Sequence, residues 1–403
     1  MNHSLHIYLK SLIFSLLMML GLASFTQEIK VSEQAQFSIM TLGPYQDELY
    51  SAFGHSAIRL TDPVSNVDWI YNYGVFDFNQ ENFYWNFAQG KMLYKLGMSR
   101  YKPFRDHYIE DDRYIIEQRL NLTQAENQRL ADFLSNNYKP ENKDYLYNYV
   151  YENCATKMRA VLDSVFPGQI TYDLSYIQKD KTIRDLMDDY LDNQPWGDWI
   201  IDIGLGQQID KVASPEEYMF LPDYVNLALA KATITKDSTT VPLVSERVQV
   251  HISNGAEEEN SMLTPFNFFV IMFFVVGFIT NRDFKKNKRT KWIDPIVFTV
   301  AGLIGWWVVF LWFGTEHLSK DNLNILWAIP LHIPFAYMLG IKKFQKFLSY
   351  YFLVVSGWYL VLLVIYSALP QPLHMAMIPL ILTMVLRGFY IHFDLRKQLK
   401  KSS

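Results

Sequence analysis

One cysteine, Cys154, is the strongest nucleophile that this sequence offers. The residue before it, Asn153, is a favoured helix N-cap, so the pattern predicts a helix that starts at Cys154. At the N-terminus of a helix, the peptide dipoles and free N–H groups stabilise a thiolate and lower the pKa of the thiol. Lys157 and Arg159 add positive charge to the first turns. Cys154 is therefore a candidate for covalent catalysis, and no intramolecular disulfide is possible.

A thiolate nucleophile needs a neighbouring base, and histidine is the usual one. Outside the N-terminal and membrane-associated segments, the sequence offers His55, His107 and His251. His55 follows Gly54 at the mouth of a predicted strand, where glycine permits a close backbone approach. A cysteine at a helix N-terminus facing a histidine on an adjacent strand is the nucleophile–base pair of papain-like enzymes.

The residues alone also fit non-catalytic interpretations. A single cysteine is most often an inert buried thiol. A histidine beside glycine is most often a turn residue, and Asn153 is explained by capping alone. The aromatic residues between positions 71 and 87 are typical of core or membrane-facing packing. A non-catalytic, membrane-anchored binding module therefore stays open as an alternative to an enzyme.

Three segments carry a resemblance to a known family: Phe53–Arg59, Tyr71–Phe78 and Asn153–Thr156. In sequence and in order, they resemble motifs of the Lnb N-terminal periplasmic domain. Lnb is a family of lipoprotein N-acyltransferases from Bacteroides-type bacteria. The resemblance covers residues 30–235 or so, and the order of signal, domain and membrane spans is similar as well.

The resemblance implies a circularly permuted, NlpC-type papain-like fold, in which the histidine precedes the cysteine as His55 precedes Cys154. It implies that Cys154 is the nucleophile and His55 the general base. For the third, orienting residue we choose Asn72, one strand after the histidine, with Asp62 and Asp77 as rivals.

The same resemblance implies acyl transfer from a phospholipid, through a thioester on Cys154, to the N-terminal cysteine amine of diacylglyceryl lipoproteins. The helix start at Asn153 and Cys154 would stabilise the oxyanion. Tyr73 and Asp77 are candidates to lie beside the substrate. This chemistry needs no metal and no diffusible cofactor. The alternative enzyme is a periplasmic cysteine hydrolase, a peptidase or amidase, which shares the catalytic pair.

An α+β soluble domain is predicted to position these residues. Strands are expected over residues 37–42, 56–60, 68–73 and 114–120. Thr123 and Glu126 form a capping box before a helix that runs to about Asn136. Further helices are expected from residue 153 to Pro167 and over residues 221–232.

The C-terminal part of the sequence reads as an all-α bundle of five transmembrane helices. The apolar segments cover residues 265–280, 295–313, 323–339, 348–369 and 373–391. Basic loops alternate with neutral ones, which places the preceding domain outside the cytoplasm and the C-terminus inside it. His317 and His374 lie near the outer mouth of the bundle. His332 lies within a span, where a functional role and a packing hydrogen bond are equally plausible.

These segments define a multi-pass protein of the inner membrane. We expect a signal peptide at 1–26, a periplasmic domain at 27–235, a linker at 236–262, the membrane domain at 263–395 and a cytoplasmic tail at 396–403. A Val-rich piece within the linker is a further candidate strand. The formal net charge is −4, and no basic run interleaved with aromatics indicates a nucleic-acid partner.

Overall fold

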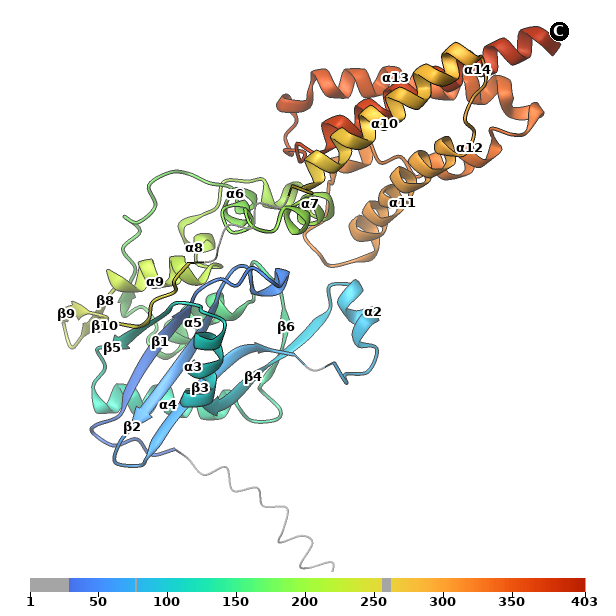
Figure 1. The fold of residues 1–403 in the computed structure, drawn as a ribbon. Helices are drawn as coiled ribbons and strands as arrows, with labels where there is room; N and C mark the ends of the chain where they lie inside the picture. The colour runs from blue at the N-terminus through green and yellow to red at the C-terminus, as the bar shows by residue number, and fades with distance from the viewer. Residues whose placement is uncertain (1–28, 77, 256–261, 403) are drawn as a thin grey trace, which may run out of the picture.

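The computed structural model describes residues 29–76, 78–255 and 262–402, and it has two parts (Figure 1). An α+β domain comes first, and an elongated helical bundle extends from one end of it. The expected signal peptide, residues 1–26, lies outside the described residues. The expected fold class, an α+β domain followed by membrane helices, is confirmed.

A seven-stranded antiparallel sheet forms the centre of the soluble domain, with strand order β10-β5-β1-β2-β3-β4-β6. The strands are β1 Gln36–Leu42, β2 His55–Asp62, β3 Val67–Val75, β4 Met92–Arg100, β5 Ile115–Leu120, β6 Asp144–Tyr147 and β10 Val244–His251. All four expected strands are present. A second, three-stranded sheet contains β7 Ile170–Thr171, β8 Thr233–Lys236 and β9 Thr239–Pro242.

Successive strand residues point to opposite sides of the large sheet, and both faces carry apolar side chains that helices cover. In β1, Phe37 and Ile39 pack towards a core that includes α4 Gln124–Asn137, α5 Cys154–Val165 and α9 Pro222–Ala230. The alternate residues Met40 and Leu42 pack with α3 Tyr101–Glu110 on the other face. The cysteine-bearing helix therefore lies directly against the strand that carries the histidine.

The local signals explain where the main helices begin and end. Thr123 and Glu126 form the expected capping box at the start of α4. Helix α5 begins at Cys154 as expected and ends at Val165, before Pro167. Shorter helices complete the domain: α2 Phe83–Ala88, α6 Ile183–Asp188, α7 Pro195–Gly204, α8 Pro215–Tyr218, and the 3-10 helices η1 Leu49–Ser51 and η2 Gln207–Ile209.

Part of the expected linker belongs to the folded domain. The Val-rich piece forms strand β10, which pairs with β5 at the edge of the large sheet. Val244 and Val250 pack against the two cores on either side of that sheet, which explains why this stretch is ordered into a strand. The domain therefore continues to His251.

The bundle has four described helices or helical stretches that are long and apolar enough to cross a membrane: residues 265–286, 293–314, 342–364 and 377–400. They belong to α10 Pro265–Lys286, α11 Ile293–Gly314, α13 Gln345–Val364 with the preceding turn η4 Lys342–Phe344, and α14 Met377–Ser402. The third expected span is broken into η3 Leu323–Leu326 and α12 His332–Met338. Pro330 lies between these two pieces, and proline has no N–H for a continuous helix.

His332 joins two elements inside the bundle. Its ring bonds the hydroxyl groups of Tyr351, at 2.8 Å, and Tyr359, both on α13. This geometry agrees with the packing interpretation of His332.

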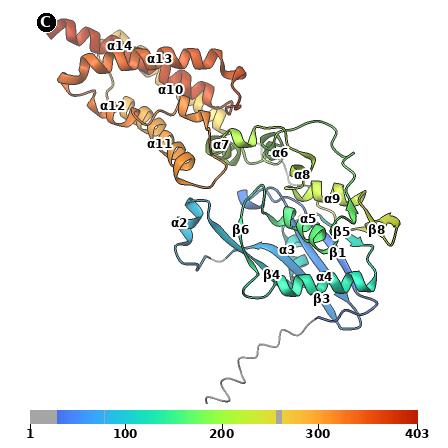
Figure 2. The same cartoon turned by 180° about the vertical axis from the view of Figure 1, so that it is seen from behind.

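The soluble domain is docked onto the bundle through helix α7 and the residues that follow it (Figure 2). The side chains of Asn322 and Asn324 donate to the backbone oxygens of Ile203 and Asp202. Gln371 donates to the oxygen of Leu205 at 2.9 Å. His374 lies 3.2 Å from Asp198, so the outer end of the bundle holds the domain at several points.

Arg184 is the charged centre of the segment that docks on the bundle. It pairs with Asp202 at 2.5 Å and Asp210 at 2.6 Å, and its side chain is 3% exposed. Arg184→Met should lower the free energy of unfolding by about 3 kcal/mol, because it leaves two carboxylates buried without their cation. The apparent melting temperature in detergent measures the effect.

Arg119→Met is the matched control. Its partner Glu246 is half exposed, so this ion pair contributes about 0 to 1 kcal/mol. Equal losses of melting temperature in both variants would contradict the prediction.

Candidate active site

The N-cap residue Asn153 fixes the position of Cys154. Its side-chain oxygen accepts hydrogen bonds from the N–H groups of Ala155 and Thr156, both at 2.9 Å. Its amide nitrogen donates to the backbone oxygens of Tyr149 and Phe220, at 2.9 and 2.8 Å. With all these bonds made, Asn153 locks the turn from which the thiol projects.

His55 and Asn72 lie on the neighbouring strands β2 and β3. Nε2 of His55 is 2.6 Å from Oδ1 of Asn72. Because an amide oxygen only accepts, this bond places the hydrogen on Nε2 and leaves Nδ1 for the thiol of Cys154. Cys154 and His55 line the same cavity, and a Cβ on Gly74 would lie about 4 Å from both side chains, so the structure brings the expected nucleophile, base and third residue together.

Two glycines make room for this arrangement. Gly54 has φ +78°, and a Cβ there would lie 2.8 Å from the oxygen of Leu42. Gly74 has φ +95°, and a Cβ there would lie about 4 Å from both Cys154 and His55. Both backbone conformations favour glycine, and a side chain at Gly54 would also clash with the backbone of Leu42.

The thiol and the imidazole stabilise each other's charged forms. Burial alone raises the pKa of the Cys154 thiol, but attraction to the His55 imidazolium and hydrogen bonds from His55 and from the N–H groups of Ser56 and Ala155 lower it overall. For His55, burial lowers the pKa, and the contacts with Cys154 and Asn72 raise it above its usual value. Both shifts favour a thiolate–imidazolium pair.

A cavity of about 340 Å³ opens above this pair, and aromatic side chains are a large part of its lining. Tyr108 of α3 stacks on the His55 ring, with centroids 6.4 Å apart and an interplanar angle of 7°. Tyr149 also lines the cavity and accepts a hydrogen bond from the N–H of Leu318, in the loop after α11. The cavity therefore borders the bundle.

The first residue of a helix has no acceptor for its N–H within that helix. Cys154 occupies this position in α5, so its own N–H can stabilise an oxyanion that forms beside the sulfur. The side chain of Asn153 has its hydrogen bonds made elsewhere, and it acts on the site by positioning the turn.

Several other expected residues lie away from the pair. Tyr73 was expected beside the substrate, but it follows Asn72 in the strand and so points to the opposite face, where its hydroxyl bonds Asn137. Asp62 bonds Ser32 and Ser65 at the β2–β3 turn, which excludes it as the orienting residue. Asp77 lies outside the described residues.

The remaining histidines also lie elsewhere. His107 is on α3 beside Asp111, and His251 pairs with Asp112 at 3.1 Å. Three lining residues had no sequence signal that tied them to Cys154: Tyr108, Arg113 and Tyr147. Tyr108 lies on α3, Arg113 in the turn after it and Tyr147 on β6. Only the three-dimensional fold shows that these elements meet at the site.

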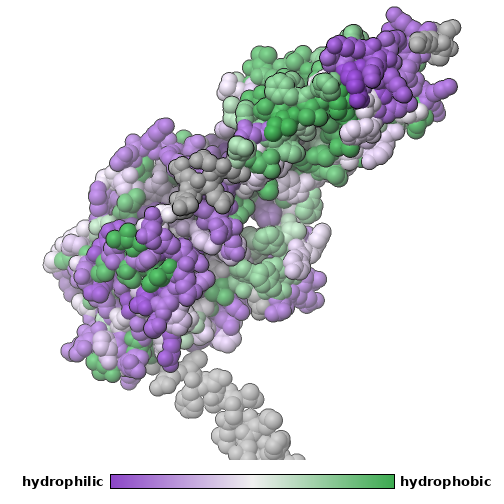
Figure 3. All heavy atoms as spheres, viewed as in Figure 1, coloured by the Kyte–Doolittle hydropathy of each residue, from purple (hydrophilic) through white to green (hydrophobic). Residues whose placement is uncertain are grey.

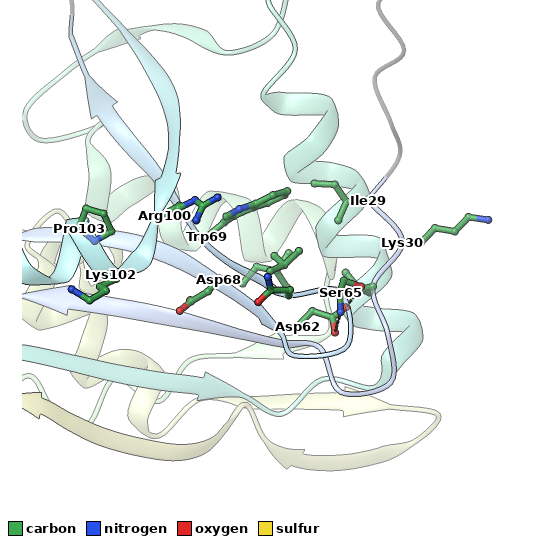
Figure 4. A pocket seen from close by; sticks show the side chains of 13 residues that line it. Ile29, Lys30, Asp62, Ser65, Asp68, Trp69, Arg100, Lys102 and Pro103 are labelled. Atoms are coloured by element: carbon green, nitrogen blue, oxygen red, sulfur yellow. Dashed lines mark hydrogen bonds between the residues drawn. The ribbon is translucent and has the colours of Figure 1, made fainter.

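A larger hollow, of about 1030 Å³, lies at the other end of the sheet (Figure 4). Asp62, Asp68, Trp69 and Arg100 line it. Asp62 is held by the two serines, and Asp68 pairs with Arg59 at 2.9 Å. This hollow lacks a nucleophile–base pair, so the smaller cavity at Cys154 is the better candidate.

Among the described residues, one group of acids and histidine has donor atoms close enough together for a metal: Asp198, Asp202 and His374. This group lies at the docking region of α7. Arg184 already pairs with Asp202, and His374 with Asp198.

The fold and the site define a membrane protein with a periplasmic domain that carries a paired cysteine and histidine. Residues 24–189 match the family model of the Lnb N-terminal periplasmic domain, and residues 257–398 match that of the Lnb transmembrane domain. The chain belongs to the Lnb family. No curated protein and no solved structure matches it.

The lowered thiol pKa predicts how alkylation depends on pH. In the wild-type protein, the rate of reaction of Cys154 with iodoacetamide should be half-maximal below pH about 8.5, the value of a free thiol. In His55→Ala the imidazolium is gone and burial remains, so the midpoint should rise above the wild-type value. Mass spectrometry of the modified chain measures the rate.

His107→Ala removes a histidine of the same domain away from the site and should leave the midpoint unchanged. An identical midpoint in wild type and His55→Ala would show that the histidine does not stabilise the thiolate.

Proposed function

We propose that this protein is a thiol acyltransferase of the inner membrane that moves an acyl chain from a phospholipid to the N-terminal cysteine amine of a diacylglyceryl lipoprotein. The observation that carries the proposal is the Cys154–His55 pair, whose side chains meet in a cavity rich in aromatic residues beside the membrane bundle. Membership of the Lnb family fits a protein of lipoprotein processing.

In the first half-reaction, the Cys154 thiolate attacks an ester carbonyl of the phospholipid. The N–H of Cys154 donates to the oxyanion of the tetrahedral intermediate. The C–O bond then breaks, and the His55 imidazolium gives its proton to the departing oxygen of the lysophospholipid. The products are a lysophospholipid and a Cys154 thioester.

In the second half-reaction, the α-amine of the lipoprotein cysteine attacks the thioester carbonyl. His55, now neutral, takes one proton from the attacking nitrogen as the amide bond forms. The C–S bond breaks and releases Cys154 as a thiolate beside the His55 imidazolium. Asn72 holds the His55 ring in the same tautomer throughout and is a positioning residue.

The lining of the cavity favours this reaction over the hydrolase alternative. Phe76, Tyr94 and Tyr147 contribute apolar ring surface, which suits an acyl chain. A peptide-cleaving enzyme would instead use an open polar groove. The contact between cysteine and histidine also argues against a non-catalytic binding module, which would not need these side chains to meet.

The membrane arrangement supports the same assignment. The first and third loops of the bundle are basic, which supports a cytoplasmic location for them and for the C-terminus, with the domain in the periplasm. Both substrates are held in the leaflet that faces the periplasm. The docked domain presents its cavity on that side of the membrane.

Substitution of the nucleophile should abolish N-acylation. A strain that lacks this protein and carries Cys154→Ala or Cys154→Ser should accumulate lipoproteins with a free N-terminal amine, because no thioester forms. Mass spectrometry of lipoprotein N-terminal peptides measures the product. Full N-acylation with Cys154→Ser would refute the assignment, and release of free peptides would indicate the hydrolase.

Asn72→Ala should lower kcat by about 10- to 100-fold, because a His55 ring that is no longer held in place loses part of its acid–base catalysis. It should also broaden the pH dependence of Cys154 alkylation, because the His55 ring loses its fixed tautomer. Asn72→Asp keeps an acceptor for Nε2 and should restore much of the rate. A kcat unchanged in Asn72→Ala would show that the amide does not position the ring.

A further inference from the structure

An exposed aromatic segment projects from the soluble domain between β3 and β4. We call residues 78–90 the aromatic arm; it contains helix α2. None of the six residues of this helix is buried, and Tyr84 is 80% and Trp85 58% exposed. Phe78 and Phe87 are also at least half exposed. Such a cluster of exposed rings marks an interaction surface.

The arm lies against the outer end of a membrane helix (Figures 1 and 2). The Trp85 ring is 6.4 Å from that of Phe310, one turn before α11 ends at Gly314. The N–H of Glu316 donates to the oxygen of Gln89 at 2.8 Å. A Cβ on Gly90 would lie 2.9 Å from the backbone nitrogen of His317, so the arm packs closely on the loop after α11.

This position puts the arm at the depth of the membrane surface. Helix α11 is long and apolar enough to cross a bilayer, and its last turn marks where the apolar layer ends. Tryptophan and tyrosine are enriched at this boundary because their rings are apolar and their edges are polar. Figure 3 shows hydrophobic surface at the arm, below the hydrophobic side of the bundle.

A continuous series of ring contacts connects the arm with the cavity of Cys154. Phe83 lies 6.1 Å from Phe87 and 6.4 Å from Phe76, between ring centroids. Phe76 stacks on Tyr94 at 5.4 Å, and Tyr94 is 4.3 Å from Tyr147. Phe76, Tyr94 and Tyr147 line the cavity, so apolar surface extends from the membrane boundary to the nucleophile.

We propose that the aromatic arm inserts into the periplasm-facing leaflet and guides the acyl chain of a phospholipid from that leaflet to Cys154. The occupant of the exposed face is therefore membrane lipid, because the face is continuous with the surface of a membrane helix. The proposal of insertion is based on the position of the arm alone. The proposal that the arm guides the acyl chain rests on the proposed acyltransferase function.

Insertion is tested with a fluorescent label on the full-length protein. In a Cys154→Ser background, Tyr84→Cys carries a single bimane group in vesicles of phosphatidylethanolamine and phosphatidylglycerol with brominated acyl chains. Bromine should quench this label strongly. The same label at Val64→Cys, 64% exposed at the far β2–β3 turn, should keep its fluorescence. Equal, weak quenching at both positions would overturn insertion.

Guidance is tested by comparing two acyl donors. For each variant, the rate of lysophospholipid release from vesicles is divided by the burst of p-nitrophenolate from soluble p-nitrophenyl butyrate. The triple variant Tyr84→Ser, Trp85→Ser, Phe87→Ser should lower this ratio about tenfold, because only the vesicle donor needs the arm. Val64→Ser, the control, should leave the ratio unchanged.

The outcomes separate the two proposals. A ratio that is unchanged in the triple variant, in a protein that is acylated by both donors, would overturn guidance by the arm. Absence of Cys154 acylation by either donor in the wild-type protein would refute the acyltransferase itself, and the bimane result would still decide whether the arm enters the membrane.

Discussion

The contact between the Cys154 sulfur and the His55 ring is the interaction on which the proposed chemistry of this protein depends. A buried charge is stable only when it is paired and hydrogen-bonded. The thiolate has its counter-charge in His55, and the nearby N–H groups of Ser56 and Ala155 lower the pKa of the thiol further. The fold makes this possible because α5 packs against β2, so that the first turn of the helix meets the first residue of the strand.

The bundle gives this site its location. Docking of α7 through Asn322, Asn324 and Gln371 fixes the domain at several separate points. Tyr149 connects the cavity wall to the loop after α11. The Cys154–His55 pair is therefore positioned relative to the membrane by directed hydrogen bonds, which set the orientation of the site.

Much of the candidate site could be predicted from the sequence because its signals are local. The Asn153 cap marks the start of the cysteine helix, and the turn at residues 63–66 places β3 beside β2 and hence Asn72 near His55. Tyr73 was misplaced because neighbouring strand residues point to opposite faces, and a motif does not say which one faces the cavity.

The rest of the site depends on long-range packing that local patterns do not carry. Strand β4 contains Lys95 and Gly97, which weaken its hydrophobic alternation, and neither β4 nor α3 was expected. Tyr108 consequently reaches His55 from an element with no sequence signal. The third span was expected as one helix because its composition is apolar, but Pro330 and the turn before it interrupt the helix.

The hydrogen bond from Asn153 to the backbone oxygen of Phe220 decides how much of the chain must be kept together when the soluble domain is transferred into a chimeric protein. The stretch matched by the periplasmic family model ends at residue 189, before Phe220, α9 and β10. In a chimera joined at residue 189, Asn153 would have to bond a carbonyl oxygen of the other protein in place of Phe220. Strand β5 would likewise have to pair with a strand of the other protein in place of β10. A graft that includes His251 would transfer the reactive turn together with the backbone that holds it.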